Sequence, residues 1–268
     1  MNAITITALL LSAGTLFAAN PEWKKDLTST SLGKHPRMPG GTMEFNVSWK
    51  NILKSGTLKM EFLPQESKKS NTYIVRSTAV SNGPAAVVFP YKGHSWSELY
   101  THSLKPKLFH STEHSKGEKI TTTSRYFSNR VECREHTVPE SKKEKTTTEN
   151  HTFNEAPVYD IGSAILHIRS QDLKKDDEIK LLIHPFSSPY LMTVKVIGRE
   201  SHMDQKAIRL SVGMQKIDRK TMKLKNYKKL KKSAILWLSD NDLRVPLEVR
   251  AEVFIGDIRA TLTQFKKS

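Results

Sequence analysis

The chain has 268 residues, enough for one large β-domain or two small domains, and 37% of them are hydrophobic, as in a folded protein with a core. Lys and Arg number 43 against 27 Asp and Glu. The net charge of +16 favours anionic partners such as anionic lipid, acidic glycan or nucleic acid. The single cysteine, Cys133, excludes an intramolecular disulfide.

The N-terminus resembles a targeting segment. Residues 4–18 form an uncharged apolar run that is short for a membrane span and typical of the core of a signal peptide. Leu16 and Ala18 occupy the −3 and −1 positions of a cleavage site before Ala19. We therefore predict a signal peptide over residues 1–18 and export to the periplasm or outer envelope. An internal apolar segment or a short membrane anchor is the alternative, since residues 1–3 carry no Lys or Arg. No later apolar run is long enough to span a bilayer.

The next segment, residues 19–40, combines Pro, Gly, Ser and Thr without hydrophobic periodicity. This composition predicts a flexible N-terminal tether. We expect the folded domain to cover residues 41–268.

From residue 41 the hydrophobic side chains alternate with polar ones, first over 43–49 and then over 58–62. Alternation of this kind predicts an antiparallel strand pair with one wet face. The apolar face could line a ligand site or, as is more common for apolar strand faces, pack into a closed core. Its candidate residues are Phe45, Trp49, Met60 and Phe62.

Residues 71–81 and 85–91 continue with β-branched and aromatic residues and predict further strands. Shorter alternating pieces fill 94–138. The charged, Thr-rich segment 139–157 reads as an exposed loop with a possible strand at its end.

A short helix is predicted near residues 160–169. Ile161, Ala164, Ile165 and Ile168 recur at helical spacing, and the carboxylate of Asp160 can cap the first turn.

Strands resume after the helix, and the best-patterned region is 234–262. Pro246 cannot donate to a strand ladder, so it indicates an edge or a bulge. Gly256-Asp257 is a candidate hairpin turn. The carboxylates at 239–242 (SDND) lack the regular oxygen spacing and the distal Glu of a calcium loop, so they predict a turn.

Several ordered motifs resemble the bacterial DUF3108 family, an uncharacterised group of exported proteins. They are MEFNVSWKNILKSGTLKMEF, VYDIGSAILHIRSQDLKKDDEIKLLI, VIGRES and ILWLSDNDLRVPLEV, and together they span about residues 41–265. The resemblance implies an all-β, mainly antiparallel fold, strongly curved or barrel-like, in the cell envelope. It carries no established catalytic residues.

A basic insertion at residues 216–232 departs from that family pattern, with nine Lys or Arg and one Asp. Such a run is usually a solvated loop. Alternatively it forms a basic finger that meets an anionic surface, with interleaved apolar residues able to enter a lipid interface. The candidate binding residues are Lys220, Lys223, Lys225, Lys228, Lys229, Lys231 and Lys232.

Catalytic and metal-binding motifs are missing from the sequence, including a nucleophile elbow, a His-Glu-x-x-His motif and a phosphate-binding glycine loop. His110 and His114 would share one metal on a helix, but the region reads as strand and loop, where they lie too far apart. Cys133 and His136 would point to opposite faces of a strand. We expect no metal, no cofactor and no catalytic residue.

Two functional hypotheses remain. The first is an exported, non-catalytic binding or carrier module for an amphiphilic or anionic envelope component. The second is a structural or assembly factor that contacts an anionic envelope surface or an acidic protein through residues 216–232. Export makes nucleic acid an unlikely natural partner.

Overall fold

The computed structural model describes residues 21–268 apart from 30, 36–37, 51, 65–70, 142, 228–229 and 254–255. The predicted signal peptide therefore lies outside the described residues. The elements are η1 (Glu22–Asp26), β1 (Gly41–Trp49), β2 (Leu53–Pro64), β3 (Thr72–Ser81), α1 (Gly83–Val88), β4 (Tyr91–Tyr100), β5 (Pro106–Ser115), β6 (Glu118–Tyr126), β7 (Val131–Pro139), β8 (Thr147–Phe153), α2 (Ile161–Ser170), β9 (Glu178–Ile183), β10 (Tyr190–His202), β11 (Gln205–Ile217), β12 (Leu224–Asn226), β13 (Ala234–Ser239), β14 (Pro246–Val253) and β15 (Gly256–Lys267).

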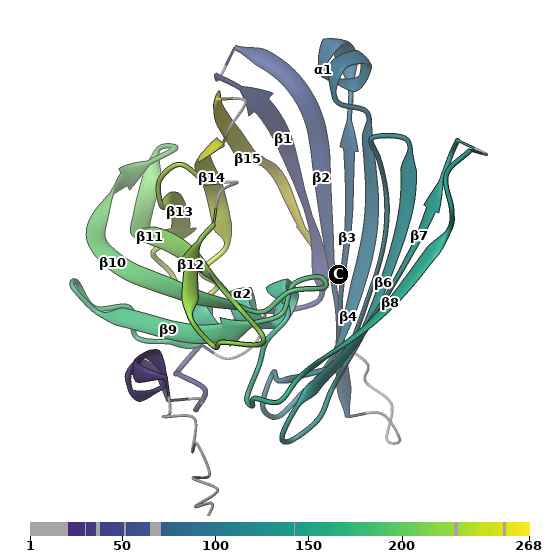
Figure 1. Ribbon diagram of the computed structural model, residues 1–268. Coiled ribbons are helices and arrows are strands. Elements are labelled where there is room, and N and C mark those ends of the chain that lie inside the picture. The colour runs from purple at the N-terminus through teal and green to yellow at the C-terminus, as the bar shows by residue number, and fades with distance from the viewer. Residues whose placement is uncertain are drawn as a thin grey trace, which may run out of the picture.

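All of these strands belong to one 15-stranded sheet in the order β8-β7-β6-β5-β4-β3-β2-β1-β15-β14-β13-β11-β10-β9, with β12 paired to β11. Every strand pair is antiparallel, and the first strand, β1, pairs with the last, β15. The sheet curls around a central space in which α2 lies (Figure 1). The predicted fold class, a mainly antiparallel and strongly curved sheet, is confirmed; the sheet is curled rather than closed.

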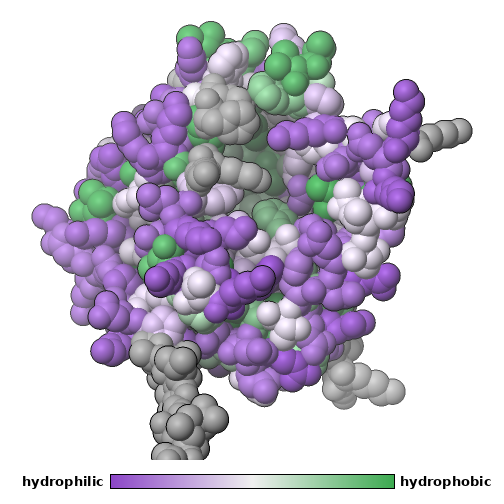
Figure 2. Space-filling view, in the orientation of Figure 1, coloured by the Kyte–Doolittle hydropathy of each residue, from purple (hydrophilic) through white to green (hydrophobic). Residues whose placement is uncertain are grey.

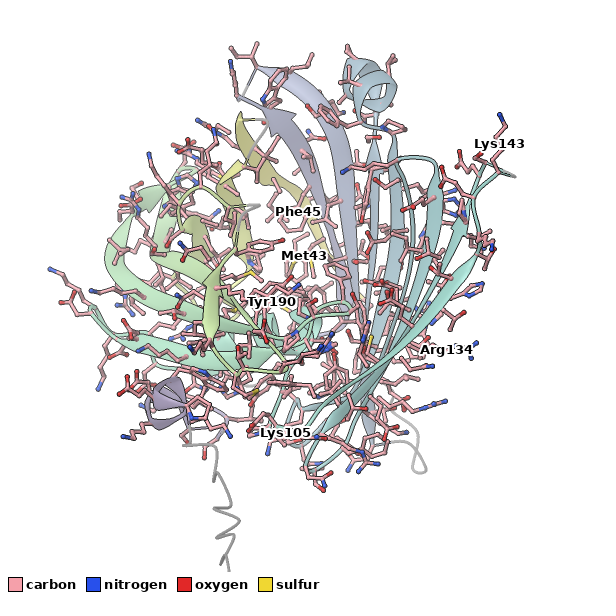
Figure 3. All side chains as sticks on the ribbon, in the orientation of Figure 1. Met43, Phe45, Lys105, Arg134, Lys143 and Tyr190 are labelled. Carbon is pink, nitrogen blue, oxygen red and sulfur yellow. The ribbon has the colours of Figure 1, made fainter. Side chains whose placement is uncertain are left out.

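The predicted alternation of β1 and β2 fixes their register. Met43 lies opposite Met60, and Phe45 lies opposite Leu58. Because side chains alternate across a strand, these residues share the inner face, and Met43 and Phe45 point into the interior (Figure 3).

The helix predicted near residues 160–169 is confirmed as α2, which lies in the interior of the curled sheet. The Asp160 side chain accepts the Ser163 N–H and the Ser163 hydroxyl accepts the Asp160 N–H, a reciprocal cap. One side of the helix packs on β9, β10, β11 and β13 through Ala164 and Ile168. Leu166 packs instead on the core of β1 to β4. The helix therefore joins the two halves of the sheet from inside.

The sheet also overlaps itself. Leu191 lies on the face of β10 opposite to Met192 and Val194, yet it is buried in a different cluster from them. That cluster combines Leu182, Leu191 and Ile217 with residues of the inner face of β5 to β8, namely Phe109, Tyr126, Val131 and Phe153. The part of the outer face of β9 to β11 around Leu182, Leu191 and Ile217 is thus covered by the inner face of β5 to β8.

The described part of residues 19–40, predicted as a flexible tether, packs on the sheet instead. Trp23 and Met38 are buried. The N–H of Thr28 donates to the Lys180 carbonyl on β9, and the Tyr73 hydroxyl donates to the Met38 carbonyl. The segment covers the edge strand β9. Its order therefore depends on hydrogen bonds to distant strands and not on hydrophobic periodicity within the segment.

Two local predictions need correction, at residues 85–91 and at Gly256-Asp257, while the strand allowed in 139–157 is present. Residues 85–91, predicted as strand, contribute most of α1, because Gly83 at φ +55° and Pro84 at the helix start favour a helical turn. The predicted loop 139–157 contains β8, the strand considered possible at its end. Gly256 and Asp257, predicted as the hairpin turn, lie in β15 and pair with Val253 and Glu252 of β14.

The bulge predicted at Pro246 is present, since the β13–β14 register shifts where Leu238 pairs with Pro246. Within the described ranges, no helix has the length and hydrophobicity needed to cross a membrane.

Candidate functional site

The inner face of the curled sheet is apolar on one side and polar on the other. On one side Val47, Ala260 and Val249 form a partly buried apolar row across β1, β15 and β14. On the other side a row of hydroxyl groups runs across β3 to β6, formed by Ser77, Ser95, Ser111 and Thr122. Figure 2 shows a hollow in this face, floored by hydrophobic residues and flanked by hydrophilic ones. The concave face therefore offers both apolar and polar contacts.

The predicted apolar face divides into two environments. Phe45, Met60 and Phe62 are buried in one core cluster, so they pack the fold. Trp49, at the end of the same strand face, is 38% exposed. A ligand can therefore reach Trp49 without unpacking the other three.

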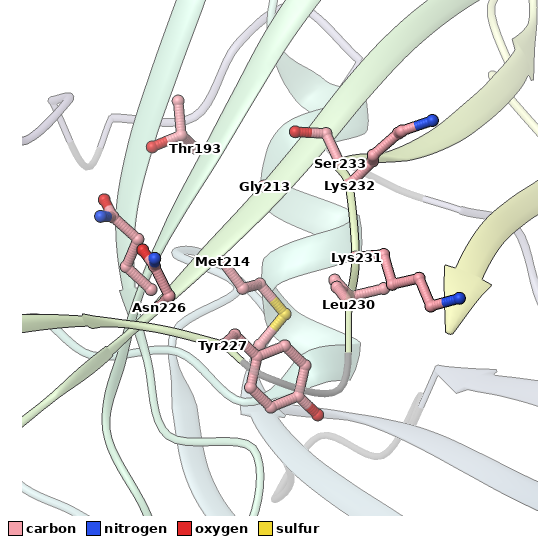
Figure 4. A pocket seen from close by; sticks show the side chains of 10 residues that line it. Thr193, Gly213, Met214, Asn226, Tyr227, Leu230, Lys231, Lys232 and Ser233 are labelled. Carbon is pink, nitrogen blue, oxygen red and sulfur yellow. The ribbon is translucent and has the colours of Figure 1, made fainter. Parts of the chain in front are cut away.

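A window opens in the wall where β11 changes its partner. Residues 207–212 of β11 pair with β13, whereas Gln215 to Ile217 pair with β12. Gly213 and Met214 lie between the two ladders, and a cavity of about 480 Å³ opens there (Figure 4). Its lining comprises Thr193, Gly213, Met214, Gln215, Asn226, Tyr227, Leu230, Lys231, Lys232 and Ser233.

The window combines apolar and cationic side chains. Met214 packs against the core around α2, and Tyr227 contacts Tyr190 edge to face with ring centroids 5.3 Å apart. Lys231 and Lys232 are exposed at the other side of the window, with ammonium groups 4.0 and 3.3 Å from the Glu252 carboxylate. Two cations share one carboxylate, which leaves the window with an excess of positive charge.

The basic segment 216–232 is only partly the solvated loop of the prediction. It contributes the end of β11 and all of β12, and Ile217 is buried. The Trp23 indole donates to the Met222 carbonyl at 2.9 Å, and Met222 packs in the cluster between the overlapping layers. The β11–β12 hairpin therefore lies against the protein.

The predicted lysines of this segment have different environments. Lys220 and Lys223 are exposed, Lys231 and Lys232 line the window, and Lys228 and Lys229 lie outside the described residues. Lys225 pairs with Asp218 at 2.6 Å. Lys225 and the backbone N–H groups of the turn lower the pKa of Asp218, so this pair holds the hairpin turn together.

Arg219 points from the hairpin toward β7 and β8. Burial lowers the pKa of its guanidinium, while Cys133, Glu135 and Glu149 act in the opposite direction. Its Nε and Nη2 atoms, like the buried Ser111 hydroxyl, have no hydrogen-bond partner within the described part of the chain. Such atoms are places for ordered water or for polar atoms of a ligand.

Cys133 is a poor candidate nucleophile. It faces the overlap between layers, where its thiol donates to the Phe186 carbonyl at 3.5 Å. Burial raises the pKa of this thiol, which lowers the thiolate fraction at neutral pH. His136 lies on the opposite face of β7 and bonds Thr148.

The acidic stretch at 239–242 connects β13 to β14, as its composition predicts. The Asn241 side-chain oxygen accepts the N–H groups of Leu243 and Arg244, and the Ser239 hydroxyl donates to it. The Asp242 carboxylate is fully exposed. Across the described residues, no group of three or more His, Cys, Asp or Glu side chains is arranged to hold a metal ion.

Sequence reasoning identified Lys231 and Lys232 but missed Met214. The signal was present, because Met214 continues the inward alternation of Ile208, Leu210 and Val212 by one further step. Gly213 beside it marks the interruption of the ladder.

Comparisons with known proteins identify one family, and the first solved structure below shares the fold. A family model described as "Protein of unknown function (DUF3108)" matches residues 44–263. The crystal structure of a β-barrel-like protein of the domain of unknown function DUF1849 from Brucella abortus aligns with a TM-score of 0.55 and 9% identity, over 87% of this chain and 99% of that one. A putative exported protein with a YmcC-like fold from Bacteroides fragilis aligns at 6% identity and a TM-score of 0.34, over 88% of this chain and all of that one. Among curated proteins, none is significantly similar.

Proposed function

The chain belongs to the DUF3108 family, whose model assigns no activity, and we propose from its geometry that it is a non-catalytic binding protein of the cell envelope. Its ligand is an amphiphile that carries an anionic group. One observation supports this proposal above the others. The window places Met214, in contact with the core, and the ammonium groups of Lys231 and Lys232 around one cavity of about 480 Å³.

The chemistry of the window suits an amphiphile in two ways. A cavity of this size is within the range of small-molecule sites, which are mostly apolar with a few placed polar groups. The apolar part of the ligand would contact Met214, Tyr227 and Leu230, while its anionic group would meet the two lysines. Displacement of Glu252 from those lysines is the electrostatic cost of binding.

The second hypothesis from the sequence, contact with a partner through the whole basic segment, has less support. Asp218 pairs with Lys225, and Met222 and Ile217 pack inward. Because these groups are engaged within the chain, the segment presents less free charge than its composition indicates.

A titration with 11-(dansylamino)undecanoic acid, an anionic fluorescent amphiphile, tests the proposal. We expect saturable binding to the wild-type chain and about tenfold weaker binding to the variant Lys231→Gln/Lys232→Gln, equal to about 1.4 kcal/mol. The matched control is Lys174→Gln/Lys175→Gln, which removes two exposed lysines from the turn before β9.

Equal affinities of the wild-type chain and the window variant would overturn the assignment of the anionic group. Absence of any saturable binding would overturn the binding site itself. Native mass spectrometry of protein purified without detergent then shows whether a molecule is retained and gives its mass.

A further inference from the structure

One end of the curl exposes large apolar side chains that no core explains. They lie in the β1–β2 turn and in the segment that includes α1. Ile52 is 88% exposed, Val87 84%, Val88 67%, Phe89 44% and Trp49 38%. α1 buries none of its residues. Ala85 and Ala86 are half-buried, but Val87 and Val88 face away from the protein, so the exposed side of this short apolar helix indicates a contact surface.

These side chains lie at one end of the curl and are called here the apolar rim, which comprises residues 49, 50, 52, 53 and 83–89. The Asn82 N–H donates to the Ser55 carbonyl at 3.0 Å, which ties the start of α1 to β2. A Cβ on Gly256 would lie 2.8 Å from the Trp49 indole nitrogen, so the indole lies against the start of β15. Figure 1 shows α1 at the same end of the curl as the tips of β1 and β2, and Figure 2 shows hydrophobic residues at this end.

Lysines lie within and beside the apolar rim, and the nearby Asp257 carboxylate pairs with Arg259. The Lys50 ammonium lies 5.4 Å from the centre of the Trp49 ring, and Lys54 and Lys92 are exposed. Neither residues 47–60 nor residues 77–97 contain an Asp or Glu. Long lysine side chains can keep their charge at the headgroup level while apolar neighbours enter the layer beneath, and Trp is favoured at that boundary.

We infer that the apolar rim docks on a phospholipid bilayer that contains anionic lipids, with α1 and the β1–β2 turn entering the headgroup region. Apolar burial and attraction to anionic headgroups act together in such binding. A second copy of the chain is a poorer occupant, because a two-fold contact would bring the rim lysines of both copies together. The inference goes beyond the proposed function and does not depend on a ligand in the window.

Vesicle flotation of the full chain tests this docking. The probes are vesicles of phosphatidylethanolamine and phosphatidylglycerol at about 7:3 and vesicles of phosphatidylcholine alone. We expect partition into the anionic vesicles to fall about tenfold or more in the variant Ile52→Glu/Val87→Glu. The control, Ile197→Glu/Met203→Glu, introduces the same charges at two exposed apolar residues on β10 and its following turn and is expected to bind normally.

A second measurement separates the rim from the apolar run at residues 4–18, which could itself bind lipid. An environment-sensitive nitrobenzoxadiazole label is attached at Val88→Cys or, as the control, at Asn129→Cys in the β6–β7 turn at the other end, with Cys133→Ser in both. We expect a blue shift on vesicle binding only for the label at 88.

Three results would overturn the inference. The first is unchanged flotation of the rim variant. The second is a label at 88 that stays in water while the chain floats, which would assign lipid binding to the N-terminal run. The third is concentration-dependent self-association that the rim substitutions abolish, which would assign the apolar rim to a second copy.

Discussion

The interior around α2 buries charged side chains, whereas the apolar rim exposes hydrophobic ones. Arg169 is fully buried, and its guanidinium donates to the carbonyls of Leu243 and His35. Arg244 is buried and donates to the carbonyls of Arg169, in the last turn of α2, and of Gln171 and Asp172, just beyond it. At the apolar rim, by contrast, Ile52 and Val87 face solvent. Both guanidinium groups of the interior find carbonyl acceptors within the chain, whereas the apolar side chains of the rim are exposed. Substitutions in the first region should therefore change stability, and those in the second should change binding.

The largest expected effect compares two aromatic residues on the same face of β1. Phe45→Ala should lower the free energy of unfolding by about 4 kcal/mol, because a buried aromatic leaves a cavity. Trp49→Ala should cost about 1 kcal/mol or less, because its side chain is partly exposed at the strand end. Urea unfolding monitored by circular dichroism measures both. Similar losses for the two variants would show that Trp49 belongs to the core.

The next effect concerns a buried charge. Arg169→Met should lower the free energy of unfolding by about 3 kcal/mol, because the Leu243 and His35 carbonyls would lose their donor. Arg134→Met is the control, since this side chain is exposed on the outer face of β7 (Figure 3) and should change stability by about 0.5 kcal/mol or less. A loss below about 1 kcal/mol for Arg169→Met would contradict the structural role of the guanidinium.

Much of the sheet follows from local alternation, which the sequence displays directly. The strands at 43–49 and 58–62 and the helix capped by Asp160 depend on neighbours within a few residues, so pattern alone predicts them. The packing of Trp23 depends instead on a carbonyl at Met222, far along the chain. Nothing near Trp23 reveals that partner, so the segment around it reads as a tether.

The overlap of the two layers is indicated by one sequence feature, a continuous apolar run within β9. The alternation of Ile179, Leu181 and Ile183 in the same strand makes this run easy to overlook. Leu181, Leu182 and Ile183 form a continuous apolar run, which is typical of a strand covered on both faces. The window is harder to predict, because it arises from a change of partner along β11 that only the three-dimensional pairing defines. Of its charged lining, Lys231 and Lys232 were identifiable from composition, but their shared contact with Glu252 was not.

The smallest of the three stability effects appears with pH. Burial lowers the pKa of His167 to about 4, with Lys105 acting in the same direction, whereas its usual value is about 6.5. The unfolded chain therefore takes up a proton as pH falls through 6.5, while the folded chain takes it up only near pH 4. Stability from the neutral imidazole is complete above pH 6.5 and is lost on acidification.

His167→Phe keeps a ring beside Tyr159 and removes this proton uptake. Between pH 7 and pH 4 the wild-type chain should lose about 2–3 kcal/mol more stability than the variant. Burial raises the pKa of Asp160 to about 6, which acts with the opposite sign in both proteins, so it cancels in the difference. Unfolding curves at the two pH values provide the measurement, and parallel losses would show that His167 does not titrate in this way.

The pairing of β1 with β15 has a consequence for the order in which the molecule acquires structure. The strands β1 to β8 are each paired with their chain neighbours, as are most of β9 to β15, so both halves can form through short-range contacts. The seam between β1 and β15 brings together residues from opposite ends of the described chain and carries the largest loop-closure entropy. Until it forms, β1 and β15 each present a long unpaired backbone edge. A chain held at that stage is exposed to edge-to-edge association with its own copies.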